Sequence, residues 1–92
     1  MKTIYKYPVE MTSAEQKIEL PKGSEVVSFV KKIDGIFLYA IVDASEQETE
    51  NRKFIVCGTG WPIKSENYKF IGSILLTEYE IYHLLEVIDN QS

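Results

Sequence analysis

The chain has 92 residues, of which 45% are hydrophobic and 26% charged, and its formal net charge is −4. This composition supplies enough apolar mass for a hydrophobic core and excludes a disordered chain, and the length predicts a single domain over residues 1–92. Acidic and basic residues are interspersed without a basic stripe, so we expect no direct binding to nucleic acid.

Two further exclusions come from cysteine usage and hydropathy. Cys57 is the one cysteine, which excludes an internal disulfide and any metal site built from several cysteines. The N-terminal stretch has no apolar signal-peptide region, and no window approaches the roughly 18 apolar residues of a membrane span. We therefore expect a soluble protein of the host-cell cytoplasm, without a membrane partner.

The first quarter of the chain has the period of two that is typical of strands. Polar residues alternate with apolar or aromatic ones over Lys2–Tyr7, and Pro8 suits an edge strand. A loop over Met11–Glu15 leads to a short predicted strand, Gln16–Leu20. The composition of Pro21–Ser24 predicts the turn that ends it.

The middle of the chain predicts a hairpin. Glu25–Ile33 and Ile36–Val42 are rich in β-branched and aromatic residues, and Asp34-Gly35 between them predicts a type I′ turn with positive φ at both positions. The strand Ile36–Val42 is apolar on both faces, which places it at the centre of a sheet. The polar segment Asp43–Asn51 is interpreted as an acidic hairpin loop between two strands.

The last third contains three more segments. Arg52–Cys57 and Tyr68–Leu76 are predicted strands. Thr77–Glu80 matches a helix capping box, and apolar residues follow it at helical spacing from Ile81 to Ile88. The same residues also alternate as in a strand, and from the pattern alone helix is slightly favoured over strand.

Several stretches together resemble a family of short proteins encoded by bacteriophages, prophages and mobile elements. They are Met1–Pro8, Ile18–Glu25, Leu38–Asp43, Gly58–Gly60, Pro62-Ile63, Ile71-Gly72 and Tyr82–Glu86. The resemblance spans nearly the whole chain and implies a phage or prophage origin.

Members of that family commonly carry glycines where this chain has Thr77–Tyr79, which implies a hairpin followed by a final strand. The resemblance therefore favours strand for residues 77–88, with helix as the alternative. Family members usually have histidine where this chain has Trp61. The family has no established activity, so the resemblance implies origin and shape rather than function.

The segment Gly58–Trp61 has two interpretations. Its backbone N–H groups could form an anion-binding nest, with Trp61 stacking on a base and Arg52, Lys53 or Lys64 pairing with phosphate. His83 is a further candidate ligand-binding residue. Alternatively, Gly58 and Gly60 make a tight turn at the end of a strand, with Thr59 between them. The turn is favoured, and ligand contact stays open.

No set of residues predicts catalysis. Cys57 lies among alternating hydrophobic residues and is interpreted as a small buried side chain, and one cysteine with His83 is a thin basis for a nucleophile pair. A single histidine offers no second imidazole for a metal site. We therefore predict a protein without enzymatic activity, metal or cofactor.

The six tyrosines exceed what one small core can bury with every hydroxyl satisfied. Some must lie at the surface, where tyrosine favours interfaces but also suits exposed strands. The candidate interface residues are Tyr5, Tyr7, Tyr39, Tyr68 and Tyr82.

These observations predict an all-β fold of about six mostly antiparallel strands in a small barrel or sandwich. We also expect a homodimer, because open strand edges need to be covered and a second copy can cover them. The expected function is that of a non-enzymatic phage accessory protein that binds and inhibits a host factor, such as a component of an anti-phage defence system. Two alternatives remain: a binder that sequesters a nucleotide at Gly58–Trp61, and a virion structural or assembly protein.

Overall fold

The computed structural model describes residues 1–88, which form seven strands and no helix. The strands are β1 Lys2–Val9, β2 Gln16–Pro21, β3 Glu25–Lys32, β4 Gly35–Asp43, β5 Thr49–Gly58, β6 Tyr68–Leu75 and β7 Ile81–Val87. The all-β prediction is confirmed, with seven strands rather than about six. The last segment is the strand β7, so the helical alternative is wrong. Over the same residues, nothing helical is long and apolar enough to cross a membrane.

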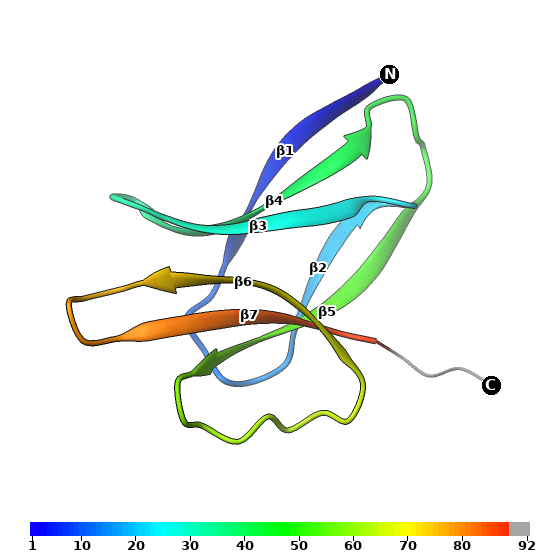
Figure 1. Ribbon diagram of the computed structural model, residues 1–92. Coiled ribbons are helices and arrows are strands. Elements are labelled where there is room, and N and C mark those ends of the chain that lie inside the picture. The colour runs from blue at the N-terminus through cyan, green and yellow to red at the C-terminus, as the bar shows by residue number, and fades with distance from the viewer. Residues whose placement is uncertain (89–92) are drawn as a thin grey trace.

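The strands form two antiparallel sheets, one in the order β1-β4-β3 and one in the order β2-β5-β7-β6 (Figure 1). β3 and β6 lie side by side at neighbouring edges of the two sheets. Gly72 on β6 lies against Phe29 on β3, where a Cβ added at the glycine would be 3.5 Å from the Phe29 backbone nitrogen, an ordinary van der Waals contact. The ladder does not continue from β3 to β6, so the sheets are not closed into a barrel and the sandwich-like arrangement is the one observed.

The main core lies between the sheets and draws on every strand. Phe54, Leu20, Leu38 and Leu84 are completely or almost completely buried there, each at the inward-facing position of an alternating strand. A second, smaller cluster lies on the opposite face of the four-stranded sheet and consists of Ile55, Cys57 and Leu85, with Val87 packed against it. The four-stranded sheet is thus apolar on both faces near β5 and β7.

The β3–β4 hairpin turns at the predicted place with a different geometry. Its two turn residues are Ile33 and Asp34, and neither has a positive φ, whereas Gly35 has a φ of 143° as the first residue of β4. The type I′ prediction is therefore wrong. The glycine supplies the unusual backbone angle one position later, where the returning strand begins.

The acidic segment after β4 is not a hairpin loop. β4 belongs to the three-stranded sheet and β5 to the four-stranded sheet, so the chain crosses between layers there. The connection is also shorter than expected, because β5 begins at Thr49. Strand patterns predict where strands lie but not which sheet each joins, which is why this expectation is wrong.

One ion pair is built into the inward face of the four-stranded sheet. Arg52 on β5 donates to both carboxylate oxygens of Glu86 on β7, with Nε–Oε2 at 2.6 Å and Nη2–Oε1 at 2.9 Å. Its Nη1 also donates to the backbone carbonyl of Ser24 in the β2–β3 turn. Glu86 is 7% exposed, and its hydrogen bonds hold the pKa of Arg52 above its usual value. Arg52 therefore joins three segments at one end of β5.

Candidate binding site

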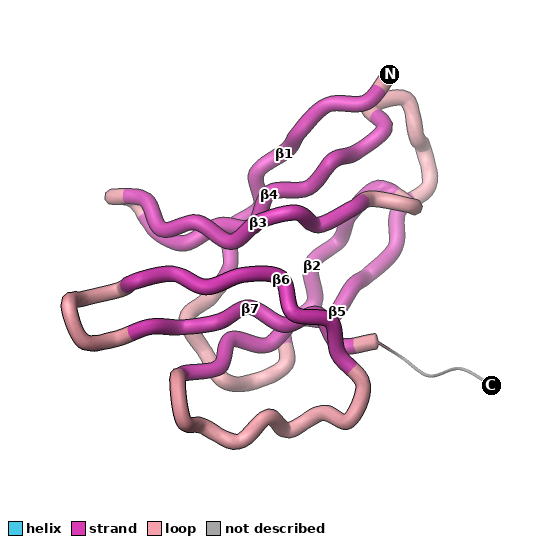
Figure 2. Tube along the Cα trace, viewed as in Figure 1, coloured by secondary structure: helices cyan, strands magenta, loops and turns pink. Residues whose placement is uncertain are grey.

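The longest loop of the described chain, residues 59–67, leaves the end of β5 and crosses to β6 (Figure 2). It opens with a turn in which the Trp61 N–H donates to the Gly58 carbonyl at 3.0 Å. Gly60, the third turn residue, has a φ of 87°, close to the value of about +80° that defines a type II turn. The Thr59 N–H donates to the Ile81 carbonyl at 3.3 Å. Two N–H groups of the segment are thus already used within the protein, which favours the turn over an anion nest.

The turn fixes Trp61 against the end of β5. A Cβ added at Gly58 would lie 2.6 Å from Cε2 of the Trp61 indole, so the ring rests directly on the glycine. The indole and the Tyr82 ring form a T-shaped pair, with a centroid distance of 5.6 Å and an interplanar angle of 78°. Glycine at position 58 is therefore needed for the space it leaves and not for its backbone angle. The indole itself stays half exposed.

Thr59 and His83 lie together, as members of a chain of hydrogen bonds. His83 Nε2 is 2.9 Å from the Thr59 hydroxyl, and His83 Nδ1 is 2.6 Å from the Ser73 hydroxyl. The Thr59 hydroxyl donates to the Ile81 carbonyl at 3.2 Å, so it accepts from His83 Nε2–H. The Ser73 hydroxyl then donates to Nδ1. This arrangement favours the Nε2–H tautomer, and the hydrogen bonds tie the loop to β6 and β7.

Cys57 and His83 are opposite each other in the β5–β7 ladder, on the same face of the sheet. The thiol is buried and lies 3.5 Å from the Trp61 carbonyl, while both nitrogens of His83 are engaged with hydroxyl groups. The sequence interpretation of Cys57 as a small buried side chain therefore matches its position. Within residues 1–88, no three His, Cys, Asp or Glu side chains are grouped to hold a metal ion.

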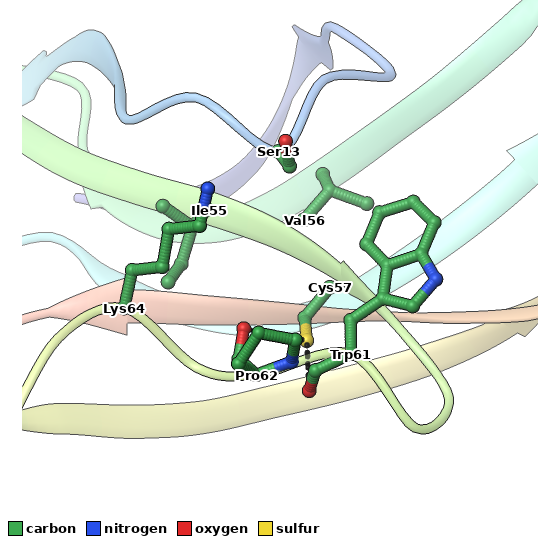
Figure 3. A pocket seen from close by; sticks show the side chains of 7 residues that line it. All are labelled: Ser13, Ile55, Val56, Cys57, Trp61, Pro62 and Lys64. Atoms are coloured by element: carbon green, nitrogen blue, oxygen red, sulfur yellow. Dashed lines mark hydrogen bonds between the residues drawn. The ribbon is translucent and has the colours of Figure 1, made fainter.

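A cavity of about 340 Å³ lies between the β1–β2 loop and the 59–67 loop, beside the last residues of β5. Figure 3 shows the residues that line it: Ser13 from the first loop, Ile55, Val56 and Cys57 from β5, and Trp61, Pro62 and Lys64 from the second loop. A neighbouring cavity of about 370 Å³ shares Ser13, Ile55 and Lys64 with it, so the two form one groove. The part of the groove beside Trp61 is mostly apolar, and Glu15 and Lys64 both line the other part.

Arg52 is not part of this groove. It is six residues from Gly58 along the same strand, a separation of about 20 Å, and its guanidinium is held by Glu86 and Ser24. Of the basic residues expected near a bound phosphate, Lys64 is the one that lines the cavity with Trp61.

The candidate interface tyrosines do not share one face. Tyr7 and Tyr82 pack against the main core, and Tyr39 is half buried on the outer face of the three-stranded sheet. Burial and, to a lesser extent, the neighbouring Tyr5 raise the pKa of Tyr7. Tyr5 is exposed on β1, and Tyr68 is exposed on the outer face of β6.

Tyr68 belongs instead to a run of exposed apolar side chains on the outer face of the β6–β7 hairpin. The register pairs Leu75 with Ile81, and a bulge between Phe70 and Gly72 keeps Phe70 on the same face. Tyr68 is 43%, Phe70 56%, Leu75 59% and Ile81 44% exposed. We call these four residues the β6–β7 stripe. The Ser73–His83 pair lies in its middle, with the Phe70 and His83 ring centroids 6.0 Å apart.

Several of these residues were not singled out by the sequence. Ser73 could have been found, because a hairpin with its tip at Thr77–Glu80 places Ser73 opposite His83. Ser13 and Val56 gave no such signal. Their proximity depends on how the β1–β2 loop passes the end of β5, which no local pattern encodes.

Comparison with known proteins places the chain in a family. It belongs to the family described as a domain of unknown function (DUF7352), whose model matches residues 1–92. Neither the curated proteins nor the solved structures give a match.

Proposed function

We propose that the chain is a non-enzymatic accessory protein of phage or prophage origin that binds and inhibits a host protein, such as a component of an anti-phage defence system. The β6–β7 stripe carries this proposal. Four large apolar side chains lie 43–59% exposed on one face of a hairpin, where burial against a partner would remove them from water. The origin is supported by the sequence resemblance alone.

The stripe has the anatomy of a docking surface. Phe70 and Leu75 are its most exposed members and stand on either side of the polar Ser73–His83 pair. An apolar patch supplies the contact area, and a polar pair inside it rejects partners that leave those groups unpaired. Because the inward face of the same hairpin fills the core through Ile74 and Leu84, outward substitutions are separable from folding.

The test is affinity capture from a lysate of the host with tagged wild-type protein and charge variants. Phe70→Glu and Leu75→Glu should each abolish capture of the specific partner. Ile33→Glu is the matched control, since Ile33 is fully exposed at the tip of the β3–β4 hairpin, outside the stripe. Capture that survives both stripe variants, or failure to capture any specific host protein, would contradict the proposal.

Sequestration of a nucleotide is a second proposal. It is favoured by one observation, that Trp61 and Lys64 line the same cavity. A nucleotide at 100 times its Kd should raise the free energy of unfolding by about 2.7 kcal/mol and alter Trp61 fluorescence, and Trp61→Ala should remove the fluorescence response. A flat thermal-shift screen against nucleotides and cyclic nucleotides would exclude this role.

The homodimer also remains a proposal. A second copy is one way to cover the β6–β7 stripe. Light scattering would then give twice the monomer mass for the wild type and the monomer mass for Leu75→Glu. A wild-type monomer at high concentration would contradict it.

A further inference from the structure

The two strands at the edge of the four-stranded sheet differ in length. β2 pairs with β5 only from Pro21–Thr49 to Gln16–Phe54, whereas β5 continues to Gly58. Over that continuation β5 is paired on one side, with β7. On the other side, where a longer β2 would lie, the chain forms the irregular β1–β2 loop.

The direction of the unpaired backbone groups follows from the hydrogen bonds at the two ends of the ladders. The Lys22 N–H donates to the Glu48 carbonyl, which continues the β2 ladder, and the Thr59 N–H donates to the Ile81 carbonyl, which continues the β7 ladder. In an antiparallel strand the N–H and C=O of one residue point to the same side and alternate along the chain. Neither β5 pairing has a register shift, so even-numbered residues of β5 face β2.

Val56 and Gly58 therefore present backbone groups to the open side of β5. The Gly58 carbonyl accepts from the Trp61 N–H, which leaves the Val56 N–H, the Val56 C=O and the Gly58 N–H. Among residues 1–88, no loop residue hydrogen-bonds to these three groups. Val56 lines the cavity of about 340 Å³ beside β5, and backbone N–H and C=O groups are strong hydrogen-bonding groups. The open edge of β5 therefore presents groups that an added strand can pair with.

The groove of Figure 3 lies at this edge. Val56, which packs into the main core, and Ile55 and Cys57, which point to the other face, all line the same cavity, as expected for a space beside the strand rather than above it. Ser13 closes one side and Trp61 the other. Lys64 is the charged residue among the seven that line this cavity, and Glu15 lines the neighbouring cavity that shares Lys64.

We propose that this groove binds an extended peptide segment of a partner protein, which adds to β5 as a strand by pairing with Val56 and Gly58. An apolar side chain of the peptide packs against Ile55 and Trp61, and a carboxylate, best that of a free C-terminus, lies at Lys64. Strand addition takes its affinity from backbone hydrogen bonds and its specificity from pockets for alternate side chains, and both are present here. This site does not depend on the β6–β7 stripe.

The first experiment is a binding screen by NMR. Uniformly ¹⁵N-labelled protein is titrated with a pool of random hexapeptides, prepared once as free acids and once as C-terminal amides. The free acids should shift the Val56 and Gly58 amides and bind about fivefold or more tighter than the amides, the effect of one charge-assisted hydrogen bond. No binding, or shifts confined to the β6–β7 stripe, would overturn the proposal.

Two altered proteins sharpen the result. Lys64→Gln should equalise the affinities of acid and amide peptides, while Lys31→Gln, an exposed lysine on β3, should leave the difference intact. Replacing the amide of Val56 by an ester, through the α-hydroxy analogue of valine, removes one N–H and no side chain. It should weaken peptide binding about fivefold. Because that N–H has no partner in the free protein, the thermal transition should fall only through the Ile55 carbonyl, which becomes a weaker ester acceptor toward β7. An unchanged affinity, or a Val56 signal that shifts with protein concentration alone, would assign the edge to something other than a partner peptide.

Discussion

The two ends of β5 are built in opposite ways. At Arg52 the strand is paired with β2, the pairing with β7 begins at the next residue, and the guanidinium joins Glu86 and the β2–β3 turn. At Gly58 one neighbour has ended, Val56 faces a cavity, and Trp61 is held by contact with a glycine. The same strand thus joins three segments at one end and leaves backbone groups unpaired with a neighbouring strand at the other.

The largest effect on stability is expected at the Arg52 end of β5, which we call the closed end because β2 pairs with the strand there. Glu86→Ala would remove both short hydrogen bonds between the half-buried Arg52 guanidinium and a carboxylate, leaving it the Glu50 carboxylate at 3.6 Å, and should lower the free energy of unfolding by about 3 kcal/mol in urea denaturation. The double variant Arg52→Met/Glu86→Leu, which replaces the pair with apolar side chains, should recover most of the loss. A single-variant loss below about 1 kcal/mol would show that the closed end is not an anchor.

A smaller effect on stability is expected at the Gly58 end of β5, the open end, where the 59–67 loop begins. Gly58→Ala would place a methyl group 2.6 Å from the Trp61 ring, so the indole must move, at a cost of about 2 kcal/mol and with a red shift of its fluorescence. In a Trp61→Ala background the same substitution should cost almost nothing. Gly60→Ala is the contrast, because nothing lies within 4 Å and its penalty comes from the positive φ, independent of Trp61.

The hydrogen bonds that join Ser73, His83 and Thr59 should contribute about 1 kcal/mol to the free energy of unfolding. Thr59→Val removes the hydroxyl that accepts from His83 Nε2–H and donates to Ile81. Imidazole ¹⁵N shifts should report the Nε2–H tautomer in the wild type and a mixture of tautomers in the variant. An Nδ1–H tautomer of His83 in the wild type would contradict the proposed direction of these hydrogen bonds.

The smallest effect lies away from β5 and serves as a baseline. Hydrogen bonds from the Ser45 hydroxyl and amide, with that of the N-terminal ammonium group, lower the pKa of Asp43 from 3.8 to about 2. A lowered carboxylate pKa adds stability above the unfolded value, which is lost as the pH falls from about 4 to 2. Asp43→Asn should reduce the fall in Tm between about pH 4 and pH 2. A pH dependence of Tm equal to that of the wild type would contradict this prediction.

The sequence predicted the strands better than their assembly. Alternation and the content of β-branched and aromatic residues located the segments that became β1 to β6. The resemblance of the whole chain favoured β7 over a helix, which the spacing of Ile81–Ile88 alone slightly favoured. The crossover from β4 to β5 was not predicted, because a polar loop has the same composition whether it joins strands of one sheet or of two sheets.

The binding residues divide in the same way. Trp61 was identified from its unusual local sequence, and it does line the cavity. Arg52 was predicted to bind a ligand, whereas it pairs with Glu86. That partner lies 34 residues away along the chain, so no local pattern could indicate it. Val56 could not have been found from sequence, since its role depends on where a neighbouring strand stops.

The most direct measurement is amide hydrogen exchange along β5 in the free protein. The open end predicts that the Val56 amide, without a partner, exchanges at least about tenfold faster than Ile55 and Cys57, which pair with β7, and faster than Phe54, which pairs with β2. Equal protection of Val56 and Phe54 would mean that the edge is already closed, and it would contradict the difference between the two ends of the strand.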